Sequence, residues 1–220
     1  MKDPLRTWCK SVWLYVVYAI GIVMLVMLVM NWNAWDHAQR IVCLLAVLLS
    51  VHVFEEDTFP NGFPYANNVA FGSDEPLVYP QNMATNMFTN LGASILFAAL
   101  VYVSPSMPYP IVTLAAVFGI GQCIGHTRSG VIVKKKFGGK GKRTIYNPGL
   151  FTSYVGLLEL SIYAIWWLVR QPFDLLGLLG GFGLMVFVAV GLILIPFAIN
   201  MRIKSERFAF ESAGYFDKYL

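Results

Sequence analysis

The chain has 220 residues, of which 57% are hydrophobic and only 13% are charged, and its formal net charge is +4. A soluble globular domain carries about 25% charged residues, so this composition excludes an ordinary soluble protein and indicates an integral membrane protein. The three cysteines form no CxxC pair, which excludes a disulfide framework and a thiolate metal site.

Six stretches of the sequence are apolar enough and long enough to cross a bilayer, which requires about 20 residues each. They cover residues 12–30, 35–56, 82–103, 108–126, 149–169 and 175–200. We therefore predict an all-α, polytopic bundle of about six transmembrane helices, which forms a single membrane-embedded domain over residues 1–220. An even number of helices places both termini on one side of the membrane.

The basic residues are distributed unevenly between the two sides of this bundle. Seven lie in the connection at residues 128–143, four in the C-terminal tail and three near the N-terminus, the first of them Lys2. By the positive-inside rule the side with these residues is cytoplasmic, so we expect cytoplasmic termini in a membrane of the bacterial inner (plasma) membrane type. The basic run has no phosphate-loop pattern and no interleaved aromatic residues, so we expect membrane lipids rather than nucleic acid as partners.

The second predicted helix ends in an imidazole and two carboxylates, which are costly in a membrane. His52, Glu55 and Glu56 have the spacings i, i+3 and i+4, which place all three on one face. In the connection that follows, residues 57–80, Pro60 and Pro64 are expected to exclude a regular helix. This segment is either a lid over a cavity or an interfacial anchor.

The third predicted helix begins with a polar stripe. Asn82, Asn86 and Asn90 follow one another at intervals of four residues. An asparagine side chain is costly in contact with lipid, so we expect this stripe to face protein or water.

The fourth predicted helix ends on the same side of the membrane with a second histidine, His126, and Arg128 follows at the interface. Gly119, Gly121 and Gly125 lie on the last turns of this helix. Small residues let helix backbones approach closely, so we expect a neighbouring helix to pack against these glycines.

The fifth predicted helix begins with Asn147 as its N-cap and Pro148 in its first turn. Along a regular helix, Thr152, Gly156 and Glu159 would share one face, with Glu159 about 16 Å inside the bilayer. Ionisable groups at such a depth are by default functional.

These histidines and glutamates are the residue types that bind zinc or non-haem iron. We predict a divalent metal site made of His52, His126 and either Glu55 or Glu56, which leaves coordination positions for water and substrate. The second glutamate would orient a ligand or act as general base, and Glu159 would make a two-metal site conceivable. Glu55, Glu56 and Glu159 are therefore the candidate catalytic residues. For each residue alone, an interhelical hydrogen bond is the alternative explanation.

A second set of polar residues is expected to hold the substrate. Its members are Asn86, Asn90, Arg128, Tyr146 and Asn147. Together the two sets predict a metal-dependent hydrolase or transferase acting on a small-molecule, lipid-like or amphipathic substrate, with an oxygen-using iron enzyme as a variant.

The alternatives are a proton- or cation-coupled transporter or ion-binding protein, and a structural or assembly factor. No apolar segment is visibly broken at the midplane and the halves do not mirror each other, which disfavours transport. A polar path to the outside would favour transport, and a closed cavity with lateral access from lipid would favour the enzyme.

The stretch His52-Val53-Phe54-Glu55-Glu56 resembles the signature of the HxxEE domain family of integral membrane proteins. The resemblance covers about residues 38–200 and includes a later histidine, His126, and a Y-N-P-G stretch at residues 146–149. It implies a largely uncharacterised family that is suspected to be enzymatic. It supports both histidines and both glutamates as site residues, and it says little about the substrate.

Overall fold

The computed structural model describes residues 3–220, so Lys2 lies outside the described residues. Within them the protein is 77% helical and contains no strand. Six helical stretches are long and apolar enough to cross a membrane, which confirms the predicted all-α fold and its six spans. The spans are Pro4–Met30, His37–Asp57, Met83–Val103, Pro108–Lys140, Leu150–Leu168 and Leu175–Ile203.

The first two spans form a helical hairpin. The first consists of α1 (Pro4–Thr7), a π-helical segment (Trp8–Val12) and α2 (Trp13–Met30), and the second is α3 (His37–Asp57). A hydrogen bond joins the two helices of this hairpin, because the buried hydroxyl of Ser50 donates to the carbonyl of Val17 at 3.0 Å.

The connection between the second and third spans contains a short helix, α4 (Phe63–Ala70). The prediction that prolines exclude a regular helix there is wrong. Pro64 lies in the first turn of α4, where the backbone N–H that proline lacks would have no intrahelical partner. Gly62, with a φ of +107°, turns the chain into this helix.

The third span is α5 (Met83–Val103), and Asn82 caps it by accepting hydrogen bonds from the backbone of its first turn. The fourth span, α6 (Pro108–Phe137), does not end at His126 as predicted, because the following basic run is helical as far as Phe137. This run contains no proline, and the helix ends only at the glycine pair 138–139.

The last two spans are interrupted by π-helical segments. The fifth consists of α7 (Leu150–Thr152), the segment η3 (Ser153–Leu158) and α8 (Glu159–Leu168), and its backbone is non-helical at Val155 and Gly156. The sixth consists of α9 (Leu175–Val186), the segment η4 (Phe187–Leu194) and α10 (Ile195–Ile203). Short 3₁₀ turns occupy Gly138–Lys140, Glu206–Phe208 and Gly214–Tyr219.

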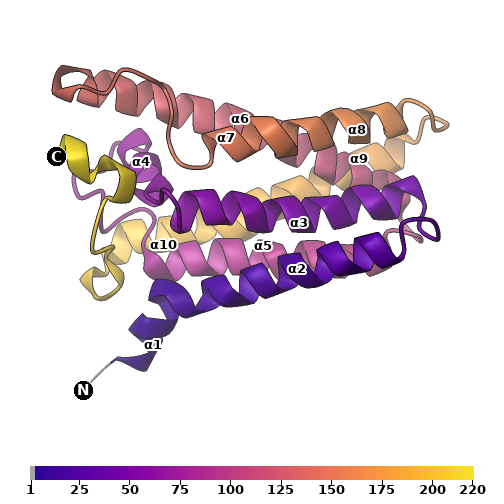
Figure 1. Cartoon of the computed structure of the whole chain (residues 1–220), viewed down its shortest axis with the longest axis horizontal. Helices are drawn as coiled ribbons and strands as arrows, with labels where there is room; N and C mark the ends of the chain where they lie inside the picture. Colours follow the sequence, from indigo (N-terminus) through magenta and orange to yellow (C-terminus); the bar gives the residue numbers. More distant parts are fainter. Residues whose placement is uncertain (1–2) are drawn as a thin grey trace.

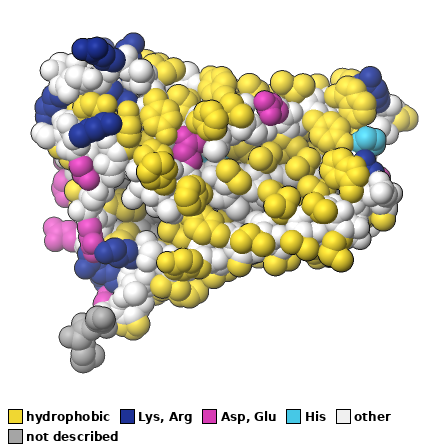
Figure 2. All heavy atoms as spheres, viewed as in Figure 1, with side chains coloured by type: hydrophobic (Ala, Val, Ile, Leu, Met, Phe, Trp, Pro, Cys, Tyr) yellow, Lys and Arg dark blue, Asp and Glu magenta, His cyan; other side chains and the backbone are white. Residues whose placement is uncertain are grey.

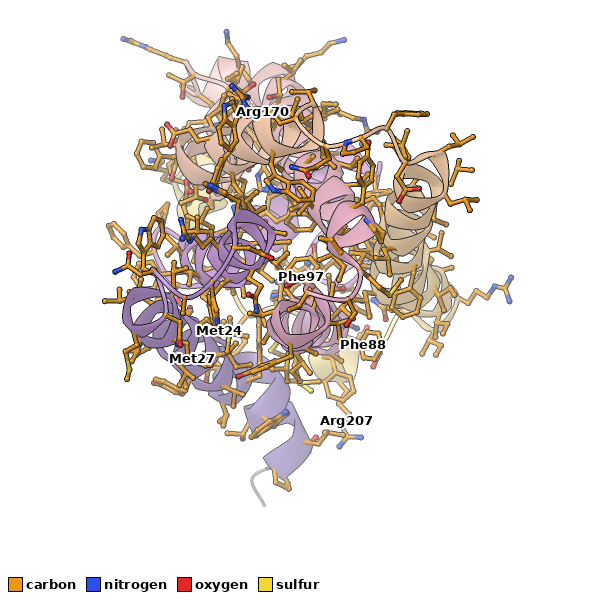
Figure 3. The ribbon with its side chains drawn as sticks, turned by 90° about the vertical axis from the view of Figure 1, so that its right-hand side faces the viewer. Met24, Met27, Phe88, Phe97, Arg170 and Arg207 are labelled. Atoms are coloured by element: carbon orange, nitrogen blue, oxygen red, sulfur yellow. The ribbon has the colours of Figure 1, made fainter. Side chains whose placement is uncertain are left out.

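The six spans run side by side, and both chain ends lie at the same end of the bundle (Figure 1). We call this the polar end; it holds α4, the end of α3 and the start of α5 and α7. The opposite, apolar end is filled by fully buried side chains such as Ile41, Leu45 and Phe97. Viewed end-on, Phe97 lies in the centre of the bundle (Figure 3).

The outside of the bundle has the pattern of a membrane protein. Hydrophobic side chains cover most of its long face, interrupted by isolated acidic side chains, while most charged side chains gather at the polar end and a few lie at the apolar end (Figure 2). This distribution fits an apolar belt inside a bilayer with both charged ends in water.

Candidate metal centre

Three side chains from two helices converge in the interior near the polar end of the bundle. Nε2 of His52 and Nε2 of His126 are 3.2 Å apart, and Oε1 of Glu56 lies 3.3 Å from the first and 3.1 Å from the second. All three residues are buried, with exposed fractions of 1% for His52, 0% for His126 and 5% for Glu56. His52 and Glu56 come from successive turns of α3, and His126 faces them from α6.

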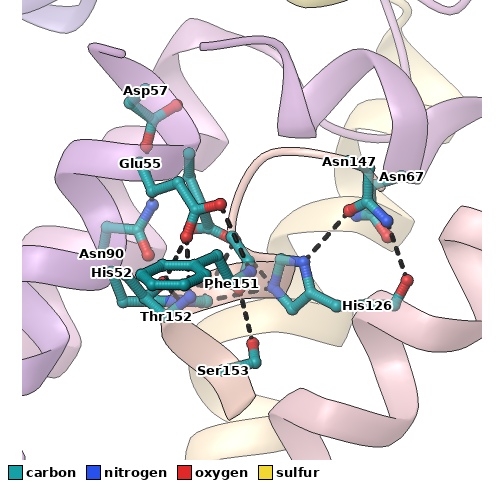
Figure 4. A network of polar contacts seen from close by, with 12 residues as sticks. His52, Glu55, Asp57, Asn67, Asn90, His126, Asn147, Phe151, Thr152 and Ser153 are labelled. Carbon is teal, nitrogen blue, oxygen red and sulfur yellow. Dashed lines mark hydrogen bonds and ion pairs between the residues drawn. The ribbon is translucent and has the colours of Figure 1, made fainter. Parts of the chain in front are cut away.

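Asn147 determines which nitrogen of His126 carries the proton. Its amide nitrogen donates to the carbonyl of His126 at 2.9 Å, so its amide oxygen faces Nδ1 of the ring at 3.1 Å (Figure 4). An amide oxygen only accepts, so Nδ1 must donate and, in the neutral ring, Nε2 keeps its lone pair.

Thr152 and Glu55 determine the protonation of His52 in the same way. The hydroxyl of Thr152 donates its hydrogen to Oε2 of Glu55 at 2.6 Å, so its oxygen accepts from Nδ1 of His52 at 2.8 Å. In the neutral ring Nε2 of His52 therefore also has a lone pair directed at the centre.

With both imidazoles neutral, two nitrogen lone pairs and a carboxylate oxygen thus point at one another. A cation between the three atoms would relieve the repulsion of their partial negative charges inside a low-dielectric interior, so the group could hold a metal ion. Ligand atoms about 2.0–2.2 Å from a tetrahedral metal ion lie about 3.3–3.6 Å apart, close to the separations of 3.1–3.3 Å found here. The donor set therefore fits zinc or iron, with a further position open.

Glu55 lies next to Glu56 in sequence but outside this group. Its carboxylate accepts from the backbone N–H groups of Phe151 and Thr152 at 3.3 and 2.8 Å, and from the hydroxyl of Tyr146 at 3.0 Å (Figure 4). The first two donors belong to the opening turn of α7, where backbone N–H groups have no intrahelical partner. Glu55 therefore anchors α7 and orients His52 through Thr152, and Glu56 is the glutamate placed to bind a metal.

The turn before α7 passes so close to the centre that only glycine fits at Gly149. Its φ is +89°, and a Cβ there would lie 2.2 Å from Cε1 of His126 and 2.9 Å from Cγ of Glu56. The whole Y-N-P-G stretch is therefore engaged with the site, since Tyr146 binds Glu55 and Asn147 binds His126.

A cavity of about 290 Å³ adjoins the centre and has His52 and Glu56 in its wall. Its polar lining residues are Asn67, Gln81, Thr89, Asn90, Gln122, Arg128 and Ser129. Its apolar lining comes mainly from Leu49, Ala93, Phe118, Met185, Val188 and Leu192. A small molecule bound there would be next to the open side of the metal centre.

The residues predicted to bind substrate fall into two groups. Asn90 and Arg128 line the cavity. Tyr146 and Asn147 are occupied by Glu55 and His126, as described above. Asn86 donates to the carboxylate of Asp57 at 2.7 Å and accepts from Gln81 and Asn90, so it supports the cavity wall from behind.

Glu159, a candidate catalytic residue, is exposed on α8 and is not part of the buried group. The expectation that it shares a face with Thr152 assumed an uninterrupted helix. The non-helical backbone at Val155 and Gly156 breaks that spacing and changes the direction in which Glu159 faces.

Sequence reasoning did not include Thr152, Asp57 or Gln81 among the site residues. Thr152 is the residue that joins Glu55 to His52, and its only sequence signal is its place one turn after the Y-N-P-G stretch. Asp57 directly follows the two glutamates, and its carboxylate accepts from Asn86 and Asn90. Gln81 bridges the cavity lining to Asn86.

Outside the membrane spans, the Glu55 side of the site extends to the C-terminal 3₁₀ turn. Lys142 is almost fully buried, donates to the carbonyl of Tyr146 and lies 4.9–5.6 Å from the ring centres of Tyr215, Phe216 and Tyr219. Burial, helped by the charge of Lys218, lowers the pKa of Lys142 to about 8. Burial and the carboxylate of Glu55 raise the pKa of Tyr146 above its ordinary value, so its hydroxyl stays protonated and donates.

A family model described as a protein of unknown function with an HXXEE motif matches residues 43–164, more than half of the chain. The match contains the motif, His126 and the Y-N-P-G stretch, and it confirms the resemblance found in the sequence over a shorter range than the expected 38–200. No curated protein and no solved structure matches the chain.

Proposed function

We propose that this chain, which belongs to the family of proteins of unknown function with an HXXEE motif, is a membrane-embedded, metal-dependent hydrolase or transferase. The observation that carries the proposal is the meeting of His52, Glu56 and His126 in a buried group that could hold a metal ion. Both histidines are held by hydrogen bonds in the tautomer that binds metals, a feature expected of metal centres rather than of simple interhelical contacts.

When bound, a zinc or iron ion would supply Lewis acidity and lower the pKa of a coordinated water. His52, His126 and Oε1 of Glu56 would hold the ion, while Asn147 and Thr152 keep the imidazoles in place. The other oxygen of Glu56 has no hydrogen-bond partner among residues 3–220, and we assign to it the acceptance of a proton from the attacking group. Phe63 stacks on His126 at a centroid distance of 4.2 Å and helps to exclude water.

The site would act on a lipid or amphipathic substrate from the cytoplasmic half of the membrane. Most basic residues of the chain lie at the polar end of the bundle, as the positive-inside rule requires of a cytoplasmic face. The cavity beside the centre extends from the polar end to the middle of the bundle, where Ala93 and Met185 line it, and the apolar end is closed by the buried side chains around Phe97. This closure supports an enzyme over a transporter, which would need a polar path through both halves.

The first test is elemental analysis of the detergent-purified protein, beside His52→Ala and His126→Ala. We expect close to one zinc or iron per chain in the wild type and loss of the metal in both variants. The exposed His37→Ala variant is the matched control and should keep the metal. Reaction products would then be sought by mass spectrometry of lipid extracts from cells expressing the wild type or His126→Ala.

Absence of metal from the wild type, even after reconstitution with zinc and with iron, would contradict the proposal. The cation between the three residues would then be a proton, because Glu56 can hydrogen-bond to either imidazole once that ring is protonated. Proton-coupled flux in liposomes would test that second function.

A further inference from the structure

We propose that the cavity beside the metal centre binds a single-chain amphiphile with an anionic headgroup, which enters from the membrane between α6 and η4. This inference deepens the proposed function, since it takes the cavity to be the substrate site of that centre. Three separate features of the cavity carry it: the charge of its polar wall, the size of its interior and the construction of its mouth.

The polar wall has one cation that no carboxylate neutralises. Within the described part of the chain, Arg128 forms no ion pair, and its guanidinium donates only to the carbonyl of Ala70, at 3.2 Å. Gln122 and Asn90 add carboxamide groups to the same cavity. A guanidinium with unused donors binds a planar or tetrahedral oxyanion in a two-pronged manner, so the ligand's headgroup is a carboxylate or a phosphate.

The remaining wall is apolar and buried, and it accommodates one hydrocarbon chain. Leu49, Phe118 and Val188 are each at most 3% exposed and lie on three different helical spans around the cavity. The volume of about 290 Å³ is near the lower end of ligand pockets, which are about 300–1,000 Å³. We therefore take the occupant to be the headgroup and the first part of one hydrocarbon chain rather than the paired chains of an ordinary bilayer lipid.

The mouth of the cavity is formed by glycines that do not serve helix packing. A Cβ at Gly125 would meet nothing within 4 Å, and one at Gly121 would meet only the terminal methyl of Met185, at 3.9 Å. In contrast, a Cβ at Gly119 would lie 2.2 Å from the carbonyl of Leu157. The prediction that these glycines allow close helix packing is therefore confirmed for Gly119 and wrong for Gly125.

The other side of the mouth is the π-helical segment η4 (Phe187–Leu194). It contributes Val188, Leu192 and Ile193 to the cavity, and the hydroxyl of Thr89 donates to the carbonyl of Leu192 at 2.6 Å. A π-helical turn widens the helix and releases backbone groups, and such turns are frequent at functional sites. Gly121 and Gly125 are exposed and line the same cavity as this segment, so we place an entrance between them that opens to lipid.

The test is binding of spin-labelled stearic acid, its methyl ester and a spin-labelled alkyl phosphate to the protein in a neutral detergent, measured by electron paramagnetic resonance. We expect the acid to bind at least about tenfold more tightly than the ester, because a hydrogen bond from a guanidinium to a charged group is stronger than one to a neutral ester. Arg128→Gln should remove this difference. The phosphate arm identifies which of the two anions is preferred.

A second pair of variants tests the entrance. Gly125→Leu should weaken binding of both acid and ester about tenfold or more by filling the mouth. Gly183→Leu is the matched control, because Gly183 is an exposed helical glycine of α9 with open space around it and no part in the cavity. A monodisperse size-exclusion profile in detergent reports folding, and Gly121→Leu replaces Gly125→Leu if that variant fails to fold.

Equal binding of acid and ester to the wild type, or equal behaviour of the Gly125 and Gly183 variants, would overturn the inference. The two proposals fail separately. Metal in the wild type without headgroup selectivity would refute only the substrate class, whereas headgroup-selective binding without metal would refute only the metal-dependent enzyme.

Discussion

The two sides of the last turn of α3 show how adjacent glutamates acquire different tasks. Glu56 faces α6, where its carboxylate lies beside two imidazole nitrogens. Glu55 points about 100° away, toward α7, where two backbone N–H groups and two hydroxyl groups donate to it. A carboxylate with four donors is satisfied by the protein alone, whereas Glu56 has no such donors within residues 3–220 and is the one placed to bind a metal ion.

Thr152 is the only described residue that hydrogen-bonds to both His52 and Glu55, and it connects the two sides. The residues on the α7 side, Glu55 and Thr152, thereby orient the imidazole of His52, although they do not contact the proposed metal position. Ligating histidines usually donate their second nitrogen to such a partner, which fixes both the ring and its tautomer. The comparison therefore predicts a graded effect of mutation, largest at Glu56 and smaller at the residues behind it.

The largest effect is expected from Glu56→Gln, with Glu55→Gln beside it for comparison. Glu56→Gln should lower the affinity for zinc by at least about 100-fold, because it replaces a charged ligand oxygen by a neutral amide. Glu55→Gln should lower it by only about tenfold, since Glu55 acts through Thr152. Titration of the apoprotein against a competing chelator measures both affinities.

Each variant is a control for the other, because the substitutions are identical and the positions are adjacent. Equal losses of affinity would show that both glutamates bind the metal. A greater loss in Glu55→Gln would reverse the assignment.

A smaller effect is expected from Thr152→Val, which keeps the shape of the side chain and removes its hydroxyl. Without this hydroxyl, Nδ1 of His52 loses its partner and the ring is free to adopt the other tautomer. We expect a loss of about 10–100-fold in zinc affinity, the usual effect of removing a partner of a ligating histidine. Thr152→Ser retains the hydroxyl and should stay close to the wild type, and failure of serine to rescue binding would contradict this role.

The sequence predicts the six spans because each depends only on a local run of apolar residues. It also brings His52, Glu56 and His126 to the same end of the bundle, since helix order and length determine that placement. It does not distinguish Glu55 from Glu56, because spacings of three and four residues both face the imidazole. Only the position of α7, a tertiary feature, separates them.

Other differences arise where local chemistry overrides a general rule. Pro64 is compatible with α4 because it falls in the first turn, and the sequence does not specify where that turn begins. The break at Val155 and Gly156 has no strong sequence signal, since glycine is common in membrane helices. Because of this break, Glu159 does not lie on the same helix face as Thr152, where a regular helix would place it.

The smallest effect is expected at Lys142, which donates to the carbonyl of Tyr146 and lies beside the aromatic rings of the C-terminal 3₁₀ turn. Burial lowers the pKa of Lys142 to about 8, whereas its ordinary value in an unfolded chain is 10.5. Between these two values the unfolded chain binds more protons than the folded one, so stability must rise as the pH increases from about 8 to 10.5. Burial raises the pKa of Tyr215 to about 12, so this neighbour stays neutral in the same range.

Thermal unfolding in detergent checks this sign if the wild type is compared with Lys142→Met, which keeps the length of the side chain and removes its charge. The difference in Tm, wild type minus variant, should increase over this pH range and be constant below pH 7. The exposed Lys140→Met variant should show no such trend. A difference in Tm that falls with pH would contradict this prediction. It would mean that the rings of Tyr215, Phe216 and Tyr219 stabilise the ammonium of Lys142 more than burial destabilises it.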